Sequence, residues 1–192
     1  MIHWLNLCGW MACVVYSTIP SFWLLIHPRA DYWRSRKHSP YLVLLPLWFV
    51  MWIILGWFTS PWRHEALYTT PWAWIPAIFL FSTGLWIYSQ SAKQFSTAQL
   101  GGLPEVLGNH REQQLVTSGI RSRVRHPIYL AHLCEMLAWN VGTGLVVCYA
   151  LTILALVTGA LMIRWEDAEL QRRFGEKYGA YREKVPAVLP RI

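Results

Sequence analysis

The chain has 192 residues, of which 55% are hydrophobic and only 14% are charged, and it contains 13 Trp residues. Together with a mean hydropathy of +0.28, this composition excludes an ordinary soluble domain and indicates an all-α protein that crosses a membrane several times. The formal net charge of +7 does not require nucleic acid as a partner, because basic loops beside anionic lipid headgroups account for it.

Five membrane helices are predicted, from the apolar windows 2–27, 40–59, 71–90, 127–141 and 146–163. A span needs roughly 20 residues, so the fourth window is short. The first window is too long for the core of a signal peptide and lacks a basic segment before it, so we expect it to remain as a span. The sequence therefore predicts one domain, with scaffold helices in 1–92, a connection in 93–126, and two helices with a C-terminal helical segment in 127–192.

The basic residues predict the orientation in the membrane. All but Arg63 of the 17 Lys and Arg residues follow the first window, lie between the third and fourth windows, or follow the fifth. Basic loops stay in the cytoplasm, so we expect the amino terminus outside and the carboxyl-terminal helix inside. The small size is typical of a prokaryotic cytoplasmic membrane protein.

The four cysteines, Cys8, Cys13, Cys134 and Cys148, lie in apolar windows without Cys-x-x-Cys spacing or clustered histidines. We expect them to pack between helices, and we predict no disulfide and no metal site.

Two polar motifs stand at the predicted cytoplasmic face. Arg125-His126-Pro127-Ile128-Tyr129 opens the fourth window, with His126 and Tyr129 on one helical face. Glu166-Asp167 follows the fifth window, and the short hairpin between these two helices should bring Glu166 near His126. By itself, the first motif is also compatible with an interfacial anchor of arginine and aromatic groups.

Glu135 is the only carboxylate well inside an apolar window, and His132 precedes it by three residues. A buried ion in a span is costly, so we expect this face to point into the bundle. Two interpretations are open: a structural hydrogen-bonded pair between these side chains, or the lining of a substrate tunnel.

The charged segment after the fifth window predicts a solvated helix. Its residues Glu169, Arg172, Arg173, Glu176 and Lys177 have the spacing of exposed ion pairs along one helix.

Three motifs in order resemble the isoprenylcysteine carboxyl methyltransferases and the related phospholipid methyltransferases. They are Leu115-Val116-Thr117-x-Gly119, Arg125-His126-Pro127-x-Tyr129, and Glu166-Asp167-x-x-Leu170 with Phe174-Gly175-x-x-Tyr178-x-x-Tyr181 and Val185-Pro186. The similarity extends from Gly84 to Pro190.

The resemblance implies a membrane enzyme that binds S-adenosyl-L-methionine in a cytoplasmic pocket and receives a lipophilic or prenylated acceptor from the bilayer. It implies a cofactor site formed by Gln113, Gln114, Leu115, Val116, Arg121, His126, Pro127, Ile128, Tyr129 and Glu166. An aromatic face such as Tyr129 attracts a sulfonium, Glu166 accepts from an ammonium or hydroxyl group, and His126 donates to a carboxylate.

The candidate catalytic residues are Glu166, with Arg125 and Arg164 as nearby cations. The candidate substrate-binding residues are Met162, at the position of the family's substrate-binding Arg, and the pair Glu135 and His132 within the fourth window. Methyl transfer is an in-line displacement that depends mainly on position. An acceptor carboxylate with a pKa of about 3.5 is ionised at pH 7 and needs no general base.

Two positions depart from the family pattern. Arg121 stands where the family usually has Tyr, and Met162 stands where it places a substrate-binding Arg, four residues before Glu166. Arg164 lies about 200° away around a regular helix, so it replaces that Arg only if the helix is irregular. The favoured acceptor is therefore an isoprenylcysteine-type carboxylate, and a lipid amine or a small thiol stays open.

Two other interpretations compete with a methyltransferase. The C-terminal motifs also resemble the sterol reductases, which use NADPH, although Ile128 stands where that family favours Asn. The remaining interpretation is a non-catalytic membrane scaffold, in which Glu166→Ala and His126→Ala would leave partner binding intact.

Overall fold

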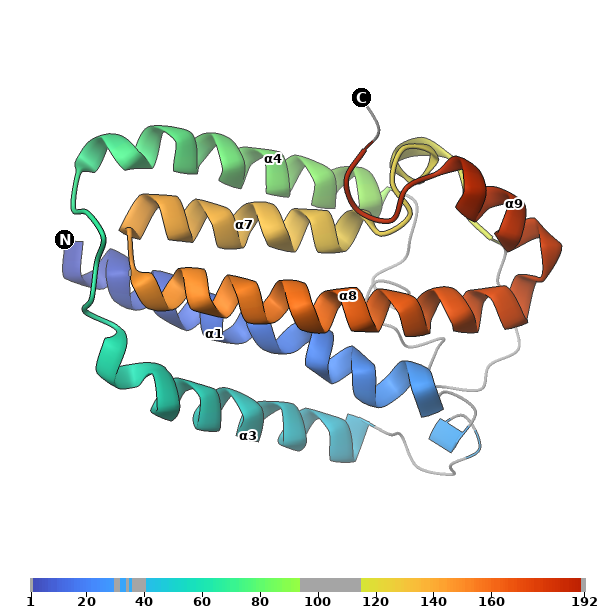
Figure 1. The fold of residues 1–192 in the computed structure, drawn as a ribbon, viewed down its shortest axis with the longest axis horizontal. Helices are drawn as coiled ribbons and strands as arrows, with labels where there is room; N and C mark the ends of the chain where they lie inside the picture. The colour runs from blue at the N-terminus through green and yellow to red at the C-terminus, as the bar shows by residue number, and fades with distance from the viewer. Residues whose placement is uncertain (1, 30–31, 34, 36–40, 94–114, 191–192) are drawn as a thin grey trace.

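Five long helices lie side by side and form a bundle (Figure 1). The computed structural model describes residues 2–29, 32–33, 35, 41–93 and 115–190. The long helices are α1 (Ile2–Ile26), α3 (Tyr41–Thr59), α4 (Trp74–Ala92), α7 (Pro127–Thr143) and α8 (Val146–Phe174), and the shorter α9 (Glu176–Lys184) follows. The described residues contain no β-strand, only an isolated bridge between Ala66 and Leu145. The predicted all-α class is confirmed.

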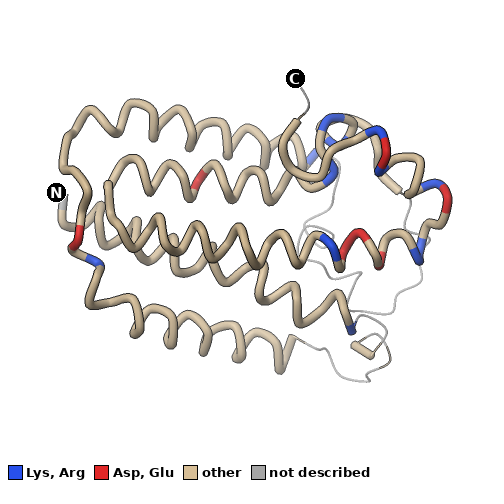
Figure 2. Tube along the Cα trace, in the orientation of Figure 1, with Lys and Arg blue, Asp and Glu red and all other residues tan. Residues whose placement is uncertain are grey.

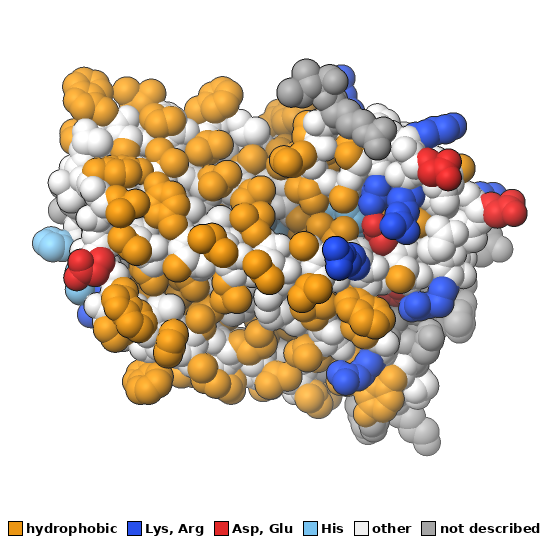
Figure 3. Space-filling view, in the orientation of Figure 1, with side chains coloured by type: hydrophobic (Ala, Val, Ile, Leu, Met, Phe, Trp, Pro, Cys, Tyr) orange, Lys and Arg blue, Asp and Glu red, His pale blue; other side chains and the backbone are white. Residues whose placement is uncertain are grey.

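Four of the helices are long and apolar enough to cross a membrane. They lie in His3–Arg29, Tyr41–Trp62, Pro71–Ala92 and Val146–Phe174. Their outer faces carry exposed large apolar side chains, among them Phe49, Trp57 and Phe79, and such groups cover most of the bundle in Figure 3. Helix α7 has 17 residues and is short for a span, so a fifth span remains a prediction.

The helices pack in two main pairs. Helix α4 lies along α7, and α1 lies along α8 and also contacts α7 and α3. The approach of α4 to α7 is close at Gly84, where an added Cβ would lie 3.0 Å from Cγ of Glu135. Helix α3 is fixed to α1 by two indoles, because Trp48 and Trp52 both donate to Oγ1 of Thr18 at 2.9 Å.

A tight hairpin joins α7 to α8. Gly144 ends α7 with a φ of +68°, a conformation that residues with a side chain rarely adopt. Its carbonyl accepts from the backbone of Leu67 at 2.9 Å, and the backbone of Val146 donates to Glu65 at 3.0 Å. The hairpin thereby holds the loop between α3 and α4.

The charged residues lie mainly at one end of the bundle (Figure 2). We call this the charged end; it contains residues 115–126 and 164–190. The connection between α3 and α4, which includes Arg63 and Glu65, lies at the opposite end (Figure 1). The predicted connection in 93–126 is described only from 115 onward.

The fifth apolar window and the charged helical segment predicted after it form one helix. Helix α8 continues without a break from Val146 to Phe174. Gly175, with a φ of +56°, then separates it from α9. Gly179 does not interrupt α9, which runs to Lys184 just before Pro186.

Candidate active site

The start of α7, the second half of α8 and the C-terminal tail meet at the charged end. The tail crosses the first turn of α7, where the backbone N–H groups of Arg125 and His126 donate to Pro186 and Ala187, both at 2.9 Å. Pro127 is the first residue of α7, where its missing N–H costs nothing. This crossing places the side chains of Arg125 and His126 beside α8.

Asp167 connects three of these segments. Its Oδ2 lies 2.7 Å from Nη2 of Arg125, and its Oδ1 lies 3.0 Å from Nε2 of His126. The phenol of Tyr178 in α9 donates to the same Oδ1 at 2.5 Å. Burial and the bond to Asp167 raise the pKa of Tyr178, so this phenol remains a donor at neutral pH.

Arg125 also secures the C-terminal tail. Its Nη1 donates to the carbonyl of Val185 at 2.5 Å and to that of Arg182 at 3.2 Å. The side chain is buried, and its partners are a carboxylate and two carbonyls of the protein. Arg125, predicted as catalytic, therefore holds together the segments that form the site.

His126 lies between two carboxylates. Its Nδ1 is 3.2 Å from Oε2 of Glu166, and its Nε2 faces Asp167. Burial alone would lower the pKa of His126, but Glu166 and Asp167 outweigh that effect and raise it from 6.5 to about 9. The imidazole is therefore positively charged at neutral pH, with Nε2 in hydrogen-bond contact with Asp167 and Nδ1 at ion-pair distance from Glu166.

Glu166 keeps an acceptor atom without a hydrogen bond. Its Oε2 is buried and has no hydrogen-bond partner in the described part of the chain, because the contact with His126 has the distance of an ion pair but not the alignment of a hydrogen bond. The side chain as a whole is 18% exposed. A buried carboxylate oxygen with spare capacity at a partly open position can accept from the ammonium or hydroxyl of a ligand.

An apolar cluster lies next to this acid–base group. Tyr178, Tyr181 and Val185 form its core, and Leu115 packs against it. Tyr181 donates to the carbonyl of Arg121 at 2.7 Å, which holds the 119–122 turn against α9. Two segments predicted to bind the cofactor, Leu115-Val116 and Arg121, thus lie at the charged end, whereas Gln113 and Gln114 lie outside the described residues.

The rings of α7 extend the site along the helix. Tyr129 stacks on His126, with ring centroids 5.7 Å apart and an angle of 25° between the planes. Ile128, the next predicted cofactor residue, is half-buried at the start of the helix. Within the predicted motif 125–129, His126 and Tyr129 thus form a ring stack, and Arg125 and His126 contact the carboxylates of α8.

Arg164 does not lie where an Arg at position 162 would lie. Met162 is fully buried, whereas Arg164 is exposed. Helix α8 is a continuous α-helix through both positions, so the two side chains point about 200° apart. The irregularity that Arg164 would need in order to replace the missing Arg does not occur.

Glu135 pairs with α1 instead of with His132. The phenol of Tyr16 donates to Oε2 of Glu135, which is buried. Among the described residues, no hydrogen bond joins Glu135 to His132. The ring of His132 instead contacts Tyr16 and Tyr88, with centroids 5.3 and 5.5 Å apart. The structural pair between Glu135 and His132 was therefore wrong, and a role in binding substrate remains a prediction.

Glu169 is not solvated, contrary to the prediction from its spacing. Its Oε2 lies 2.7 Å from Nδ1 of His27, which follows α1, and both side chains are buried. Trp23 stacks on His27 with a centroid distance of 5.4 Å. The pattern within the segment could not reveal this pair, because the partner lies 142 residues away in the chain.

Asp167 and Tyr178 are the main site residues for which no role was predicted from the sequence. Both lie in the motifs that carry the family resemblance, but the predicted chemistry belonged to the neighbouring Glu166. Successive helical residues point about 100° apart, so Asp167 turns toward Arg125 and Tyr178 while Glu166 points elsewhere. The signal that could have identified Asp167 was the presence of an arginine, Arg125, in the other polar motif as a possible ion-pair partner.

The fold and this site define a helical membrane protein with a buried acid–base cluster at one end of its bundle. The profile of the family described as Phospholipid methyltransferase matches residues 72–177, which include α4, α7, α8 and the start of α9. The chain belongs to this family. The family resemblance inferred from the motifs is thus confirmed.

Three relatives are named as protein-S-isoprenylcysteine O-methyltransferases. The Xenopus laevis protein is 35% identical over 83 residues, covering 41% of this chain and 27% of the relative. The Arabidopsis thaliana proteins B and A are 32% and 33% identical, over 82 and 88 residues, covering 40% and 43% of this chain and the same shares of each relative. The matches thus span less than half the length of each relative. No solved structure is significantly similar to this chain.

Proposed function

We propose that the protein is an S-adenosyl-L-methionine-dependent methyltransferase that acts on a lipophilic acceptor delivered by the membrane. Membership of the phospholipid methyltransferase family and the names of three relatives support a methyltransferase. The observation that carries the proposal is the buried Oε2 of Glu166, which has spare accepting capacity beside the stacked rings of His126 and Tyr129.

The residues at the charged end fit this cofactor. When bound, the cofactor would supply a methyl group on a positively charged sulfur. Glu166 would accept from its ammonium or a ribose hydroxyl, and Tyr129 offers an aromatic face to a cation. Leu115 and Val116 would provide apolar contact for the adenine. His126 would orient Glu166 rather than bind the cofactor directly, because its two nitrogens face Glu166 and Asp167.

The acceptor that we propose is an isoprenylcysteine-type carboxylate, as the names of the relatives suggest. Such a group is ionised at neutral pH, so the protein must position it but need not remove a proton. The prenyl chain would reach the site from the lipid along the bundle, past Met162 and the face of α7 that carries His132 and Glu135. A lipid amine would also need a base to take its proton, which the fully engaged Asp167 cannot easily provide.

The proposed orientation places the charged end in the cytoplasm. Among the described residues, Lys and Arg concentrate there, whereas the loop between α3 and α4 at the opposite end contains one, Arg63, in agreement with the positive-inside rule. We propose five spans, with α7 completing the bundle despite its length. A prenylated cysteine and a soluble methyl donor would then both reach the site from the cytoplasmic side.

Calorimetric titration of the detergent-purified protein with S-adenosylhomocysteine and, separately, with NADPH tests the proposal. We expect binding of S-adenosylhomocysteine alone, weakened at least tenfold in Glu166→Ala and partly retained in Glu166→Gln, which keeps an acceptor oxygen. The exposed Arg172→Ala serves as the matched control. Binding of NADPH alone would indicate a reductase, and binding of neither would favour the scaffold.

A further inference from the structure

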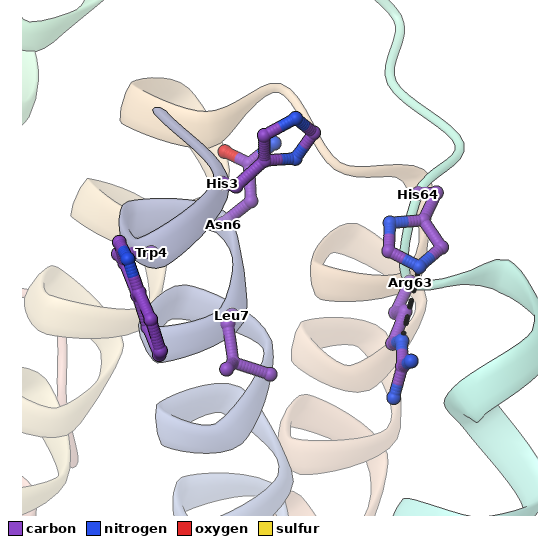
Figure 4. A pocket seen from close by; sticks show the side chains of 6 residues that line it. All are labelled: His3, Trp4, Asn6, Leu7, Arg63 and His64. Carbon is purple, nitrogen blue, oxygen red and sulfur yellow. Dashed lines mark hydrogen bonds between the residues drawn. The ribbon is translucent and has the colours of Figure 1, made fainter. Parts of the chain in front are cut away.

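A cavity lies at the opposite end of the bundle from the proposed active site. It occupies about 300 Å³ between the start of α1 and the loop that follows α3, and it is lined by His3, Trp4, Asn6, Leu7, Arg63 and His64. Figure 4 shows Arg63 and His64 facing the first two turns of α1 across this space. Three of the six side chains are basic or can become so.

The guanidinium of Arg63 is held in one orientation. Its Nε donates to Nε2 of His64 at 3.1 Å, and its Cζ lies 5.5 Å from the ring of Trp10. That ring is itself fixed, because Trp10 is buried and its Nε1 donates to Oγ1 of Thr59 at 3.0 Å. A cation stacked on a fixed indole and oriented by a neighbouring ring loses little freedom when it binds a ligand.

The terminal donors of the Arg63 guanidinium face no acceptor among the described residues. Within the described part of the chain, neither terminal nitrogen of Arg63 makes a hydrogen bond or ion pair, so the two-pronged edge that matches an oxyanion is available. Because Nε2 of His64 accepts from Arg63, the proton of the neutral ring is on Nδ1, which is a further donor.

The surroundings favour an anion. Glu65, the only acidic residue in the 60–73 loop, is exposed and does not line the cavity. The positive end of the α1 dipole lies at the cavity, since its lining residues begin at His3. The helix dipole therefore adds to the positive potential that Arg63 creates in the cavity, and no carboxylate among the lining residues offsets it.

The cavity also borders the apolar surface of the bundle. Trp4 is 71% exposed and Trp62 is 49% exposed, and Arg63 directly follows the span Tyr41–Trp62. Exposed tryptophans beside an arginine at the end of a span are typical of the level of lipid headgroups. We propose that Arg63, with His64 and His3, binds a phosphate group in this cavity, supplied by the headgroup of an anionic lipid or by free phosphate.

Binding of defined probes to the full-length protein tests this site. Native mass spectrometry measures retention of phosphatidylglycerol and of diacylglycerol with the same acyl chains, and calorimetry measures inorganic phosphate. We expect phosphatidylglycerol to bind better than diacylglycerol, and Arg63→Ala to weaken its binding about tenfold, as expected for loss of one charge-assisted contact. Arg63→Lys keeps the charge but not the two-pronged edge. Its affinity for phosphatidylglycerol should therefore lie between those of the wild type and Arg63→Ala.

The matched control is Arg172→Ala, which removes an exposed arginine at the charged end. Equal losses of phosphatidylglycerol binding in Arg63→Ala and Arg172→Ala would overturn the proposal, as would equal retention of phosphatidylglycerol and diacylglycerol together with no phosphate binding. Arg63-dependent binding of inorganic phosphate at the same affinity as the lipid would identify a soluble source, and binding of the lipid alone would identify the membrane.

Two further measurements distinguish a specific loss of phosphate binding from unfolding and from damage to the proposed active site. His64→Ala removes the group that orients Arg63 but leaves the packing on Trp10, so it should also weaken lipid retention. The helical circular dichroism of Arg63→Ala in detergent should match that of the wild type, which shows that the variant is folded without relying on cofactor binding. If the wild type binds S-adenosylhomocysteine, Arg63→Ala should bind it equally well. Lipid or phosphate binding at Arg63 can therefore be tested whether or not the protein is a methyltransferase.

Discussion

Arg125 and Asp167 form a buried ion pair of 2.7 Å between residues 42 positions apart in the chain. Nη1 of the arginine donates to the carbonyls of Arg182 in α9 and Val185 in the tail, and Oδ1 of the aspartate takes bonds from His126 and from Tyr178 in α9. One pair therefore connects the start of α7, the middle of α8 and the tail. Several of the motifs that carry the family resemblance are structural parts of one junction.

Removing the Asp167 carboxylate should lower the free energy of unfolding of the protein, because this side chain holds several segments together. Asp167→Ala leaves the buried guanidinium of Arg125 without its carboxylate and removes one of the two carboxylates beside His126, and breaking a buried pair in this way costs about 3–5 kcal/mol. We expect a clearly lower midpoint of thermal unfolding in detergent, whereas the exposed Arg172→Ala should match the wild type. A midpoint equal to that of the control would show that the junction contributes little.

The stability of the charged end should fall as the pH rises through about 9. The pKa of His126 is raised from 6.5 to about 9 by Glu166 and Asp167, against the effect of burial. The charged imidazole thus contributes its full stabilisation below the unfolded pKa of 6.5 and loses it as pH rises through the folded value. The shift corresponds to about 3 kcal/mol.

Unfolding midpoints measured between about pH 6 and pH 10 check this dependence. His126→Gln has no titrating ring, so its midpoint should be lower at neutral pH and should change less over this range. A wild-type midpoint that stays level through pH 9, or a variant that declines in parallel with the wild type, would contradict the assignment to His126.

The buried pair of His27 and Glu169 should couple α1 to α8 energetically. A double-mutant cycle with His27→Ala and Glu169→Ala should give a coupling free energy of about 0.5–3 kcal/mol, as for buried residues in contact. The exposed residues Arg172 and Glu176 supply a comparison cycle, which should give less than about 0.5 kcal/mol. Equal couplings in the two cycles would show that the buried contact adds nothing.

Met162→Arg should raise methyl transfer to a prenylated cysteine analogue. Position 162 is one helical turn before Glu166, so an arginine there could pair with that carboxylate and also face an acceptor carboxylate. We expect a lower KM for the acceptor, measured by transfer of a labelled methyl group. Met162→Leu keeps the apolar character and should behave as the wild type.

The outcome depends on the variant folding, because Met162 is fully buried. Titration with S-adenosylhomocysteine checks this separately. A variant that binds S-adenosylhomocysteine normally but shows no change in KM would rule out the missing arginine as the limit on a carboxylate acceptor.

Local patterns predicted most of what depends on neighbours in the chain. Apolar windows identified the five long helices, because each helix satisfies its own backbone and exposes apolar side chains to lipid. Pro127 indicated the start of α7 and the glycines of 140–144 indicated the hairpin, since both act through their own backbone conformation. The proximity of Glu166 to His126 followed from that hairpin alone.

Contacts between distant segments could not be predicted in this way. Glu169 read as one member of an exposed ion pair, yet it is buried against His27, and Glu135 accepts from Tyr16 of α1 instead of pairing with His132. In both cases the decisive partner lies more than one hundred residues away. Spacing within a helix says which side chains share a face, but not which helix covers that face.

The sequence by itself determined the helical membrane class, the positions of the motifs and the family, because these depend on composition and on order along the chain. Only the tertiary structure decided which charge does what at the site. Asp167 and Arg125 hold the junction, and His126 lies between Asp167 and Glu166. Among the described carboxylates of this cluster, Glu166 keeps a buried oxygen that is ion-paired but makes no hydrogen bond. The physical reason is that burial and pairing of a charge are set by the packing of four separate segments, which no single segment encodes.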